Sequence, residues 1–244
     1  MSTQHDPTIV ALINGRTVGR GEVLAWENRR IDAAAKKLGI DAPAAGGTEA
    51  RREAFLSTKL ALGSSEIESR LSRDIHWAER VSKVGARVSS RRRRSITDLQ
   101  VAEGSAAHFA EWFDTCSRDS DERAMLRACP DHFVIRTGTD GRQEVIETTG
   151  GSPMAARFYV DYSETSSLVT PPDPNFPHQI AGVARAADGT PVGGVRHQFR
   201  DLDKGFQARL TVEFPLPSAG MMITQHRWHL ACEFSNWITA AAKA

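Results

Sequence analysis

Two histidines and a tyrosine in the C-terminal half of the chain could carry acid–base chemistry. His197 and His226 have imidazole side chains, which exchange protons near neutral pH and can act as general acid or base. Tyr162 could donate a hydrogen bond to a negatively charged oxygen that develops on a substrate. We therefore predict that His197, His226 and Tyr162 are catalytic.

Hairpin turns predict how these residues lie relative to their apolar neighbours. The pair Asp188-Gly189 is typical of a two-residue turn, and Asp203-Lys204 marks the next turn. The resulting registers place His197 between Ile180 and Leu210 on one apolar face. An apolar face that carries a few polar groups indicates a ligand cavity. The predicted ligand-binding residues are His178, Phe158, Phe199, Leu210 and Trp228.

The opposite face of the same strands collects polar and charged residues. Arg196, Arg209 and Glu213 belong to it, and we expect this face to be solvated. The long segment Ser163 to Pro177 holds several prolines and no regular periodicity, which is typical of a lid or binding loop. We expect it to border the mouth of the cavity.

The segment Met222 to Trp237 has two interpretations. Its residues alternate from Thr224 to Ser235, which favours a half-buried strand. A helix is the alternative, because a set of apolar residues also falls on one helical stripe: Ile223, Leu230, Phe234, Trp237 and Ala241. Of the two, the strand is the structure we predict for this segment.

The same segment decides whether a metal site is expected. On a helix, His226, His229 and Glu233 would lie together, whereas on a strand the two histidines point to opposite faces and cannot share an ion. With the strand favoured, we predict no metal site and no cofactor. The three cysteines Cys116, Cys129 and Cys232 have no metal-ligand spacing and no nucleophile motif, so reduced thiols are expected.

The chain divides by pattern into two regions. Residues 1–90 are expected to be mostly helical after a small hairpin around Asn14-Gly15. Residues 95–244 are expected to form an α+β domain with two short helices followed by antiparallel strands. The four arginines Arg91 to Arg94 between the regions are interpreted as an exposed linker or strand end. The stretch Ile9 to Trp26 resembles the N-terminal chaperone segment of parvulin-type foldases, although no prolyl isomerase domain follows.

The predicted fold class is therefore α+β: a helical N-terminal region, then a curved antiparallel sheet wrapped on two short helices around a cavity. If Met222 to Trp237 is a strand, the architecture resembles the NTF2-like class. If it is a helix, the order of strand, two helices, six strands and long helix is similar to the helix-grip class of START and Bet v 1-type proteins. Such folds host enzymes and binding proteins alike.

Composition and charge limit the classes of binding partner that can be expected. The 244 residues carry a net charge of +1, which gives no global attraction to nucleic acid or to an anionic membrane. The N-terminal residues lack a signal-peptide pattern, so a cytoplasmic location is expected. The expected partners are a small apolar organic ligand and, through the N-terminal helices, a second copy of the chain.

Two functions remain open from the sequence. The first is an enzyme that works by cofactor-free acid–base chemistry on a small, largely apolar molecule, as a lyase or isomerase of the dehydratase or cyclase type. The second is a non-catalytic ligand-binding or chaperone-like module. A carboxylate buried beside a cavity histidine would favour the enzyme.

Overall fold

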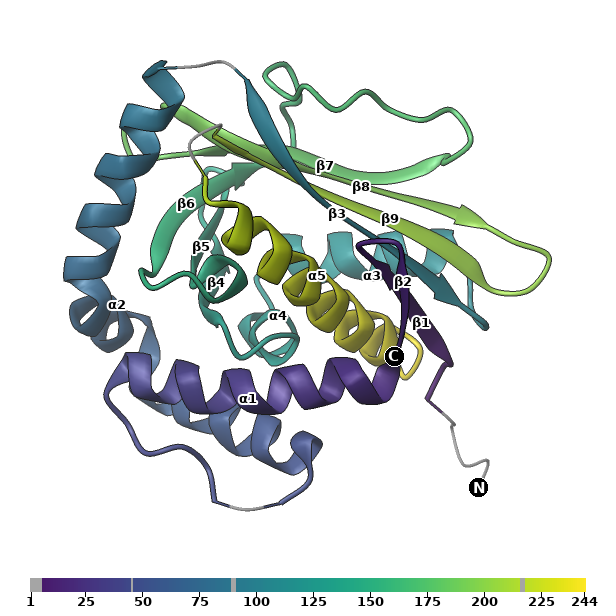
Figure 1. Cartoon of the computed structure of the whole chain (residues 1–244), viewed down its shortest axis with the longest axis horizontal. Coiled ribbons are helices and arrows are strands. Elements are labelled where there is room, and N and C mark those ends of the chain that lie inside the picture. Colours follow the sequence, from purple (N-terminus) through teal and green to yellow (C-terminus); the bar gives the residue numbers. More distant parts are fainter. Residues whose placement is uncertain (1–5, 45, 89–90, 216–217) are drawn as a thin grey trace.

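The computed structural model describes residues 6–44, 46–88, 91–215 and 218–244. Nine antiparallel strands form one open sheet in the order β2-β1-β3-β9-β8-β7-β6-β5-β4, and α5 lies along its concave side (Figure 1). The strands are β1 (Ile9–Ile13), β2 (Arg16–Gly19), β3 (Arg92–Val101), β4 (His132–Thr137), β5 (Gln143–Glu147), β6 (Ala156–Asp161), β7 (His178–Arg185), β8 (Pro191–Asp201) and β9 (Phe206–Pro215). The helices are α1 (Arg20–Leu38), α2 (Thr48–Val88), α3 (Ala106–Arg118), α4 (Glu122–Arg127), the short 3-10 turn η1 (Thr149–Gly151) and α5 (Gly220–Ala241).

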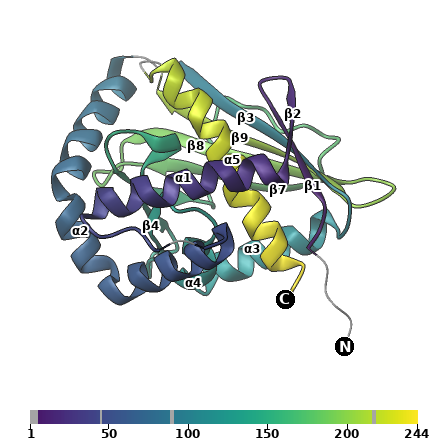
Figure 2. The ribbon, with the colours of Figure 1, turned by 60° about the horizontal axis from the view of Figure 1, so that its bottom comes forward.

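The strand prediction for Met222 to Trp237 is wrong, because this segment lies within helix α5. All ten residues from residue 230 to residue 239 are buried. A helix that is covered on every side has no polar face, so its sequence lacks the one-sided pattern of a surface helix. Figure 2 shows the reason: α5 lies between the sheet and helix α1. From β3 onward the chain follows the order expected for the helical alternative.

The predicted registers of the central strands are confirmed. Ile180 lies opposite His197 in the β7–β8 ladder, and His197 lies opposite Leu210 in the β8–β9 ladder. Phe199 pairs with both His178 and Ala208, as the turns indicated. Turn residues therefore set these registers correctly even though the next element was assigned wrongly.

The N-terminal elements join the same sheet and core as the rest of the chain. β1 pairs with β3, and the hairpin turn at Asn14-Gly15 has the positive φ angles of 53° and 75° expected there. Ile9 and Trp26 belong to one hydrophobic cluster with residues of α3 and α5. The predicted boundary near residue 90 falls where the chain turns into β3, and residues 89 and 90 themselves lie outside the described residues.

The arginine run starts a strand, so the linker interpretation is corrected to a strand end. Arg92 and Arg94 belong to β3 and lie opposite Pro215 and Glu213 of β9. Further along β3, Ser95, Thr97 and Leu99 are fully buried. The run thus forms the polar end of a central strand.

The convex face of β8 and β9 is covered by the proline-rich segment. Glu213 accepts hydrogen bonds from the backbone N–H groups of Val169 and Thr170, and Gln198 accepts one from Asp173. Arg196, Gln198 and Glu213 are consequently buried, which corrects the expectation of a solvated face here.

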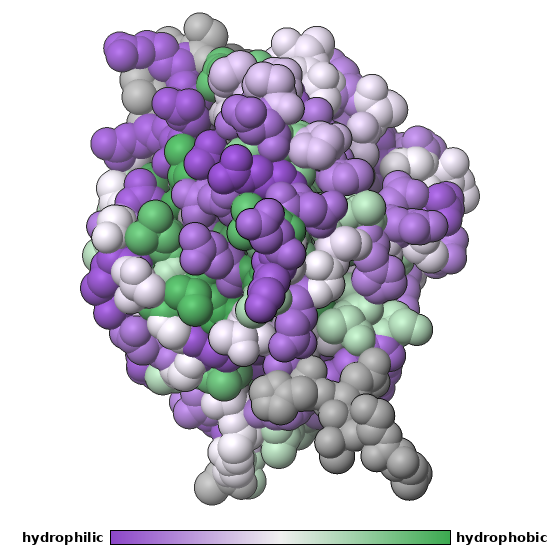
Figure 3. Space-filling model, turned by 90° about the vertical axis from the view of Figure 1, so that its right-hand side faces the viewer, coloured by the Kyte–Doolittle hydropathy of each residue, from purple (hydrophilic) through white to green (hydrophobic). Residues whose placement is uncertain are grey.

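The molecular side shown in Figure 3 is mainly hydrophilic, with small apolar areas between polar side chains. None of the helices that the structure describes has the length and apolar character needed to cross a bilayer.

We expect Gly150→Ala to destabilise the fold strongly. Gly150 has a φ of 59°, and a Cβ atom there would lie 2.5 Å from the backbone nitrogen of His226, so η1 could no longer pack on α5. Gly189→Ala is the matched control, because its φ is 83° but nothing lies within 4 Å of its Cβ position. Urea denaturation should show Gly150→Ala to be less stable than Gly189→Ala by about 1–3 kcal/mol. Equal stabilities would contradict the close approach.

Candidate metal centre

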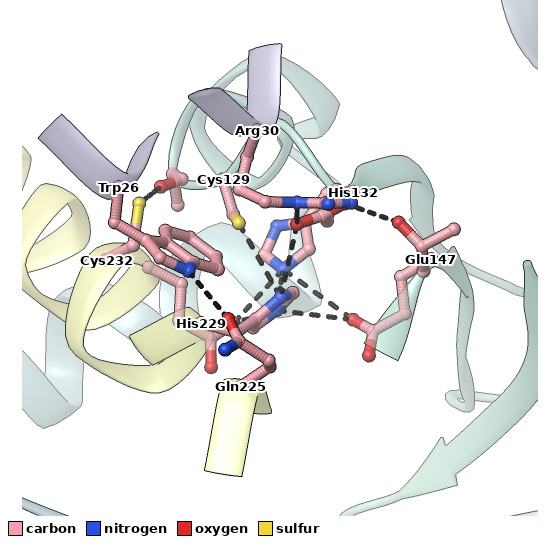
Figure 4. Close-up of polar contacts among 12 residues, drawn as sticks. Trp26, Arg30, Cys129, His132, Glu147, Gln225, His229 and Cys232 are labelled. Carbon is pink, nitrogen blue, oxygen red and sulfur yellow. Dashed lines mark hydrogen bonds and ion pairs between the residues drawn. The ribbon is translucent and has the colours of Figure 1, made fainter. Parts of the chain in front are cut away.

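Four ionisable side chains converge below α5, and we call them the His–Glu cluster: His132, Glu147, His229 and Glu233. His132 opens β4 and Glu147 closes β5, and the β4–β5 hairpin pairs them directly. His229 and Glu233 are four residues apart on α5, so their side chains lie on one face of the helix. Figure 4 shows His132, His229 and Glu147 pointing toward one another.

The cluster has the ligand spacing of a tetrahedral metal site. His132 Nε2 lies 3.1 Å from His229 Nε2, 3.1 Å from Glu233 Oε2 and 3.7 Å from Glu147 Oε2. His229 Nε2 lies 3.7 Å from Glu147 Oε2 and 3.5 Å from Glu233 Oε2. Ligand atoms about 2.0–2.1 Å from a zinc ion are about 3.3–3.4 Å apart in a tetrahedron. These separations lie within about 0.4 Å of that value, and the three closest ligands, His132, His229 and Glu233, could hold an ion with its fourth position open.

The other ring nitrogen of each histidine has its own partner, as metal-bound imidazoles usually do. His132 Nδ1 lies 3.4 Å from the carbonyl oxygen of Met125, and His229 Nδ1 lies 3.7 Å from Cys129 Sγ and 3.9 Å from Asp131 Oδ2. An Nδ1–H that donates to these groups leaves the Nε2 lone pair directed into the cluster. Cys129 with the two histidines, and Glu147 with His226 and His229, form further groups of potential ligand atoms.

A second layer of side chains holds these partners in place. Arg30 donates to both oxygens of Asp131, at 2.9 and 2.6 Å, and Thr148 donates to the same carboxylate. Because Arg30 comes from α1, the N-terminal region contributes directly to the site. Figure 4 shows Arg30 beside Cys129 and His132.

Lys59 from α2 fixes the loop that leads into His132. Its ammonium group donates to the carbonyl oxygens of Leu126, Cys129 and His132, at 3.1, 3.4 and 2.6 Å. The side chain is fully buried, and burial lowers the pKa of Lys59 to about 8. It thus satisfies carbonyl groups that follow α4 and lack helical partners.

The charge state of the cluster without an ion follows from its surroundings. Burial alone would lower the pKa of His229, but the charges of Glu147 and Glu233 raise it to about 9. Burial favours a raised pKa for Glu233, yet the charge of His229 and hydrogen bonds with both cluster histidines hold it well below its usual range. Burial raises the pKa of Glu147. A positive charge between the carboxylates therefore stabilises the cluster.

An apolar pocket leads to the cluster. Its volume is about 150 Å³, and all four cluster residues belong to its lining. The walls are mainly apolar, with Val145, Phe158, Val160, Val195 and Val212 among the lining residues. Ser82 of α2 and Pro215 of β9 also line it.

The predicted site residues fall into two groups. His197, His226, Tyr162 and Phe158 all line the pocket. His178, Phe199, Leu210 and Trp228 do not belong to its lining. Phe199 packs against Phe109 of α3, with ring centroids 5.2 Å apart, and Trp228 lies beneath Arg16 of β2. Because α5 fills the concave face over Phe199 and Leu210, those residues form core.

The three predicted catalytic residues differ in their hydrogen bonding. The Tyr162 hydroxyl donates to Gln143 Oε1 at 3.0 Å, and burial raises its pKa. The Nδ1 atoms of His197 and His226 are buried and have no hydrogen-bond partner within the described parts of the chain. Burial lowers the pKa of His197 to about 4 and that of His226 well below the usual value, so both imidazoles are neutral at pH 7.

Sequence reasoning missed His132 and Glu147 and set aside His229 and Glu233. The sequence did contain indications of the site, because His132 and Glu147 flank the turn at Asp140-Gly141, and a helix would have placed His229 with Glu233.

No known protein-family model matches this chain, and no curated protein matches it.

We expect Lys59→Met to cost about 2–4 kcal/mol of unfolding free energy, because three buried carbonyl oxygens lose their common donor. Lys37→Met is the matched control: Lys37 is partly exposed and pairs with Asp74 at 2.7 Å, so its loss should cost less than about 1 kcal/mol. Urea denaturation of both variants measures the difference. Similar losses for the two lysines would show that Lys59 has no special role.

We expect His197→Gln to reduce the acid sensitivity of the fold. The pKa of His197 is about 4 in the folded protein and about 6.5 when unfolded, so only the unfolded state binds this proton between those values. Wild type therefore loses stability as the pH falls from 6.5 toward 4, by about 2 kcal/mol at pH 5. Denaturation at pH 7.5 and pH 5 should show that the variant lacks this loss, whereas His76→Gln, at an exposed position on α2, retains it.

Proposed function

We propose that the protein is a zinc-dependent hydrolase that acts on a carbonyl group of a small, largely apolar molecule. The supporting observation is the His–Glu cluster, which lines an apolar pocket. His132, His229 and Glu233, whose ligand atoms lie 3.1–3.5 Å apart, would hold the zinc ion and leave its fourth position open for water. Glu147, 3.7 Å from both imidazoles, would lie beside that position as a general base, and the two carboxylates would balance the double positive charge. This proposal replaces the expectation of a site without a metal.

The pocket supports the choice of substrate. A volume of about 150 Å³ suits a molecule the size of a single aromatic ring. The mainly apolar walls favour a substrate whose polar groups are confined to one end, next to the cluster. When bound, a zinc ion polarises a carbonyl oxygen and lowers the pKa of a water molecule to about 7.

The residues around the pocket supply positioning and proton transfer. His132 and His229 are oriented by their Nδ1 partners, which keep both Nε2 atoms directed into the cluster. His197 and His226 offer unpartnered nitrogens to a substrate, so the predicted acid–base role is retained for them. Tyr162 can donate to a substrate oxygen if it exchanges its bond to Gln143. The apolar walls exclude bulk water from the reacting groups.

The order of helices and strands supports a fold that binds a ligand. The order of one strand, two helices, six strands and a long helix, with the long helix on the concave face, resembles the helix-grip class better than the NTF2-like class.

We also propose a homodimer that forms through the N-terminal helices. It is supported by the exposed apolar residues Trp77, Val81 and Val84 on α2.

Zinc binding tests the proposal. We expect the full chain to bind about one equivalent of Zn²⁺, measured by elemental analysis and calorimetry. His229→Ala and Glu233→Gln should weaken binding by at least about 100-fold, because removing a ligand costs more than removing a ligand's partner. His178→Ala is the control, since His178 does not line the pocket, and it should bind as wild type does. Full zinc affinity in both cluster variants would rule out the site.

Hydrolysis of 4-nitrophenyl acetate tests the chemistry. Chelation should reduce turnover by at least about tenfold and added Zn²⁺ should restore it, because the ion supplies both carbonyl polarisation and an activated water. His178→Ala should retain zinc-dependent turnover. Zinc binding without zinc-dependent turnover would favour the ligand-binding module over the enzyme.

A further inference from the structure

A second cleft opens where β6 and β7 separate. The described β6–β7 ladder ends with the pair Asp161 and Val183, so the first residues of β7 extend past the end of β6. The cleft beside them has a volume of about 580 Å³. Its lining comes from α3, β7, β8 and the proline-rich segment.

Arg196 is a buried cation that lines this cleft. The residue is 7% exposed, its Nε donates to the carbonyl oxygen of Thr170 at 2.9 Å, and its Nη1 donates to Gln179 Oε1 at 2.6 Å. Both acceptors are neutral. Buried charges in proteins are normally paired with an opposite charge, because the loss of hydration is otherwise uncompensated.

Asp114, the acidic residue that lines the cleft, does not neutralise the charge of Arg196. Asp114 lines the cleft from α3, but it is largely exposed and pairs with Arg118 at 2.9 Å. Glu213, on the neighbouring strand, accepts hydrogen bonds from backbone groups of the proline-rich segment instead. Among the described residues, Arg196 therefore has only neutral hydrogen-bond acceptors.

We propose that this cleft binds a small carboxylate that carries an apolar body, with Arg196 as its counter-ion. A guanidinium group presents donors in a planar fork that matches the two oxygens of a carboxylate. Phe113, Pro172 and Ile180 supply apolar surface for the rest of the ligand. A fully hydrated anion such as inorganic phosphate would gain nothing from that surface.

The site does not depend on the metal centre. Phe113 and Tyr162 line both the cleft and the pocket, so these two side chains form the partition between them. Their rings meet edge to face with centroids 6.3 Å apart, and Tyr162 is held by Gln143. A ligand in the cleft would contact the partition from the side opposite the His–Glu cluster.

Titration of benzoate into the full chain, followed by calorimetry, tests the proposal. Wild type should bind benzoate with a dissociation constant below about 10 mM, and benzamide, a neutral molecule of the same shape, at least about tenfold more weakly. Arg196→Gln should weaken benzoate binding by at least about tenfold. Arg200→Gln is the matched control, because Arg200 lies on the same strand and also donates to a glutamine, at 2.9 Å.

Ala181→Asp provides a second, independent test in case Arg196→Gln does not fold. Ala181 lies directly opposite Arg196 in the β7–β8 ladder and lines the cleft, so an aspartate there supplies the missing carboxylate within the chain. This variant should remain folded by circular dichroism and lose benzoate binding. Benzoate binding that persists unchanged in Ala181→Asp would overturn the assignment, as would absent binding to wild type or equal affinity for benzamide or inorganic phosphate.

Discussion

Two buried carboxylates that each lie within 4 Å of the same two imidazoles need positive charge between them to be stable. In the His–Glu cluster that charge is either a proton on His229 or a divalent cation. The same requirement applies further from the centre. Asp131, beside His229, is neutralised by Arg30, and Glu27 of α1 is neutralised by Arg52 of α2. Successive layers of opposite charge thus connect the centre of the molecule to helices α1 and α2.

This arrangement explains why the N-terminal helices are an integral part of the structure. Lys59 and Arg52 each bring a buried positive charge to the region around α5, and Arg30 brings a partly buried one. Without α1 and α2, Asp131 would lose its arginine partner, and the carbonyl groups of Leu126, Cys129 and His132 would lose their common lysine donor. The helices α1 and α2 therefore complete the electrostatics of the site, in addition to covering apolar residues of the core.

Much of the sheet could be predicted because turn residues act locally. The Asp-Gly turns indicated the β4–β5 and β7–β8 hairpins, but the pairing of His132 with Glu147 also depends on a shift of register between His132 and Val134 that the turn does not predict. The site was missed because it depends on α5 being a helix. From residue 230 to residue 239 this helix is buried on all sides, so its sequence has no polar stripe there, and the alternation from Thr224 to Ser235 favoured a strand instead. The same error placed Trp228 in the pocket.

The position of α5 in the chain has a consequence for how the protein is made. The nine described strands all precede α5, and His229 and Glu233 are brought to His132 and Glu147 across about a hundred residues of chain. During synthesis these strands emerge before α5, so α3 can already cover Phe199 while the part of the concave face that α5 covers is still open. The His–Glu cluster therefore assembles only after the strands that contribute His132 and Glu147 have been made, and a divalent cation that binds it would stabilise the folded chain over the unfolded one.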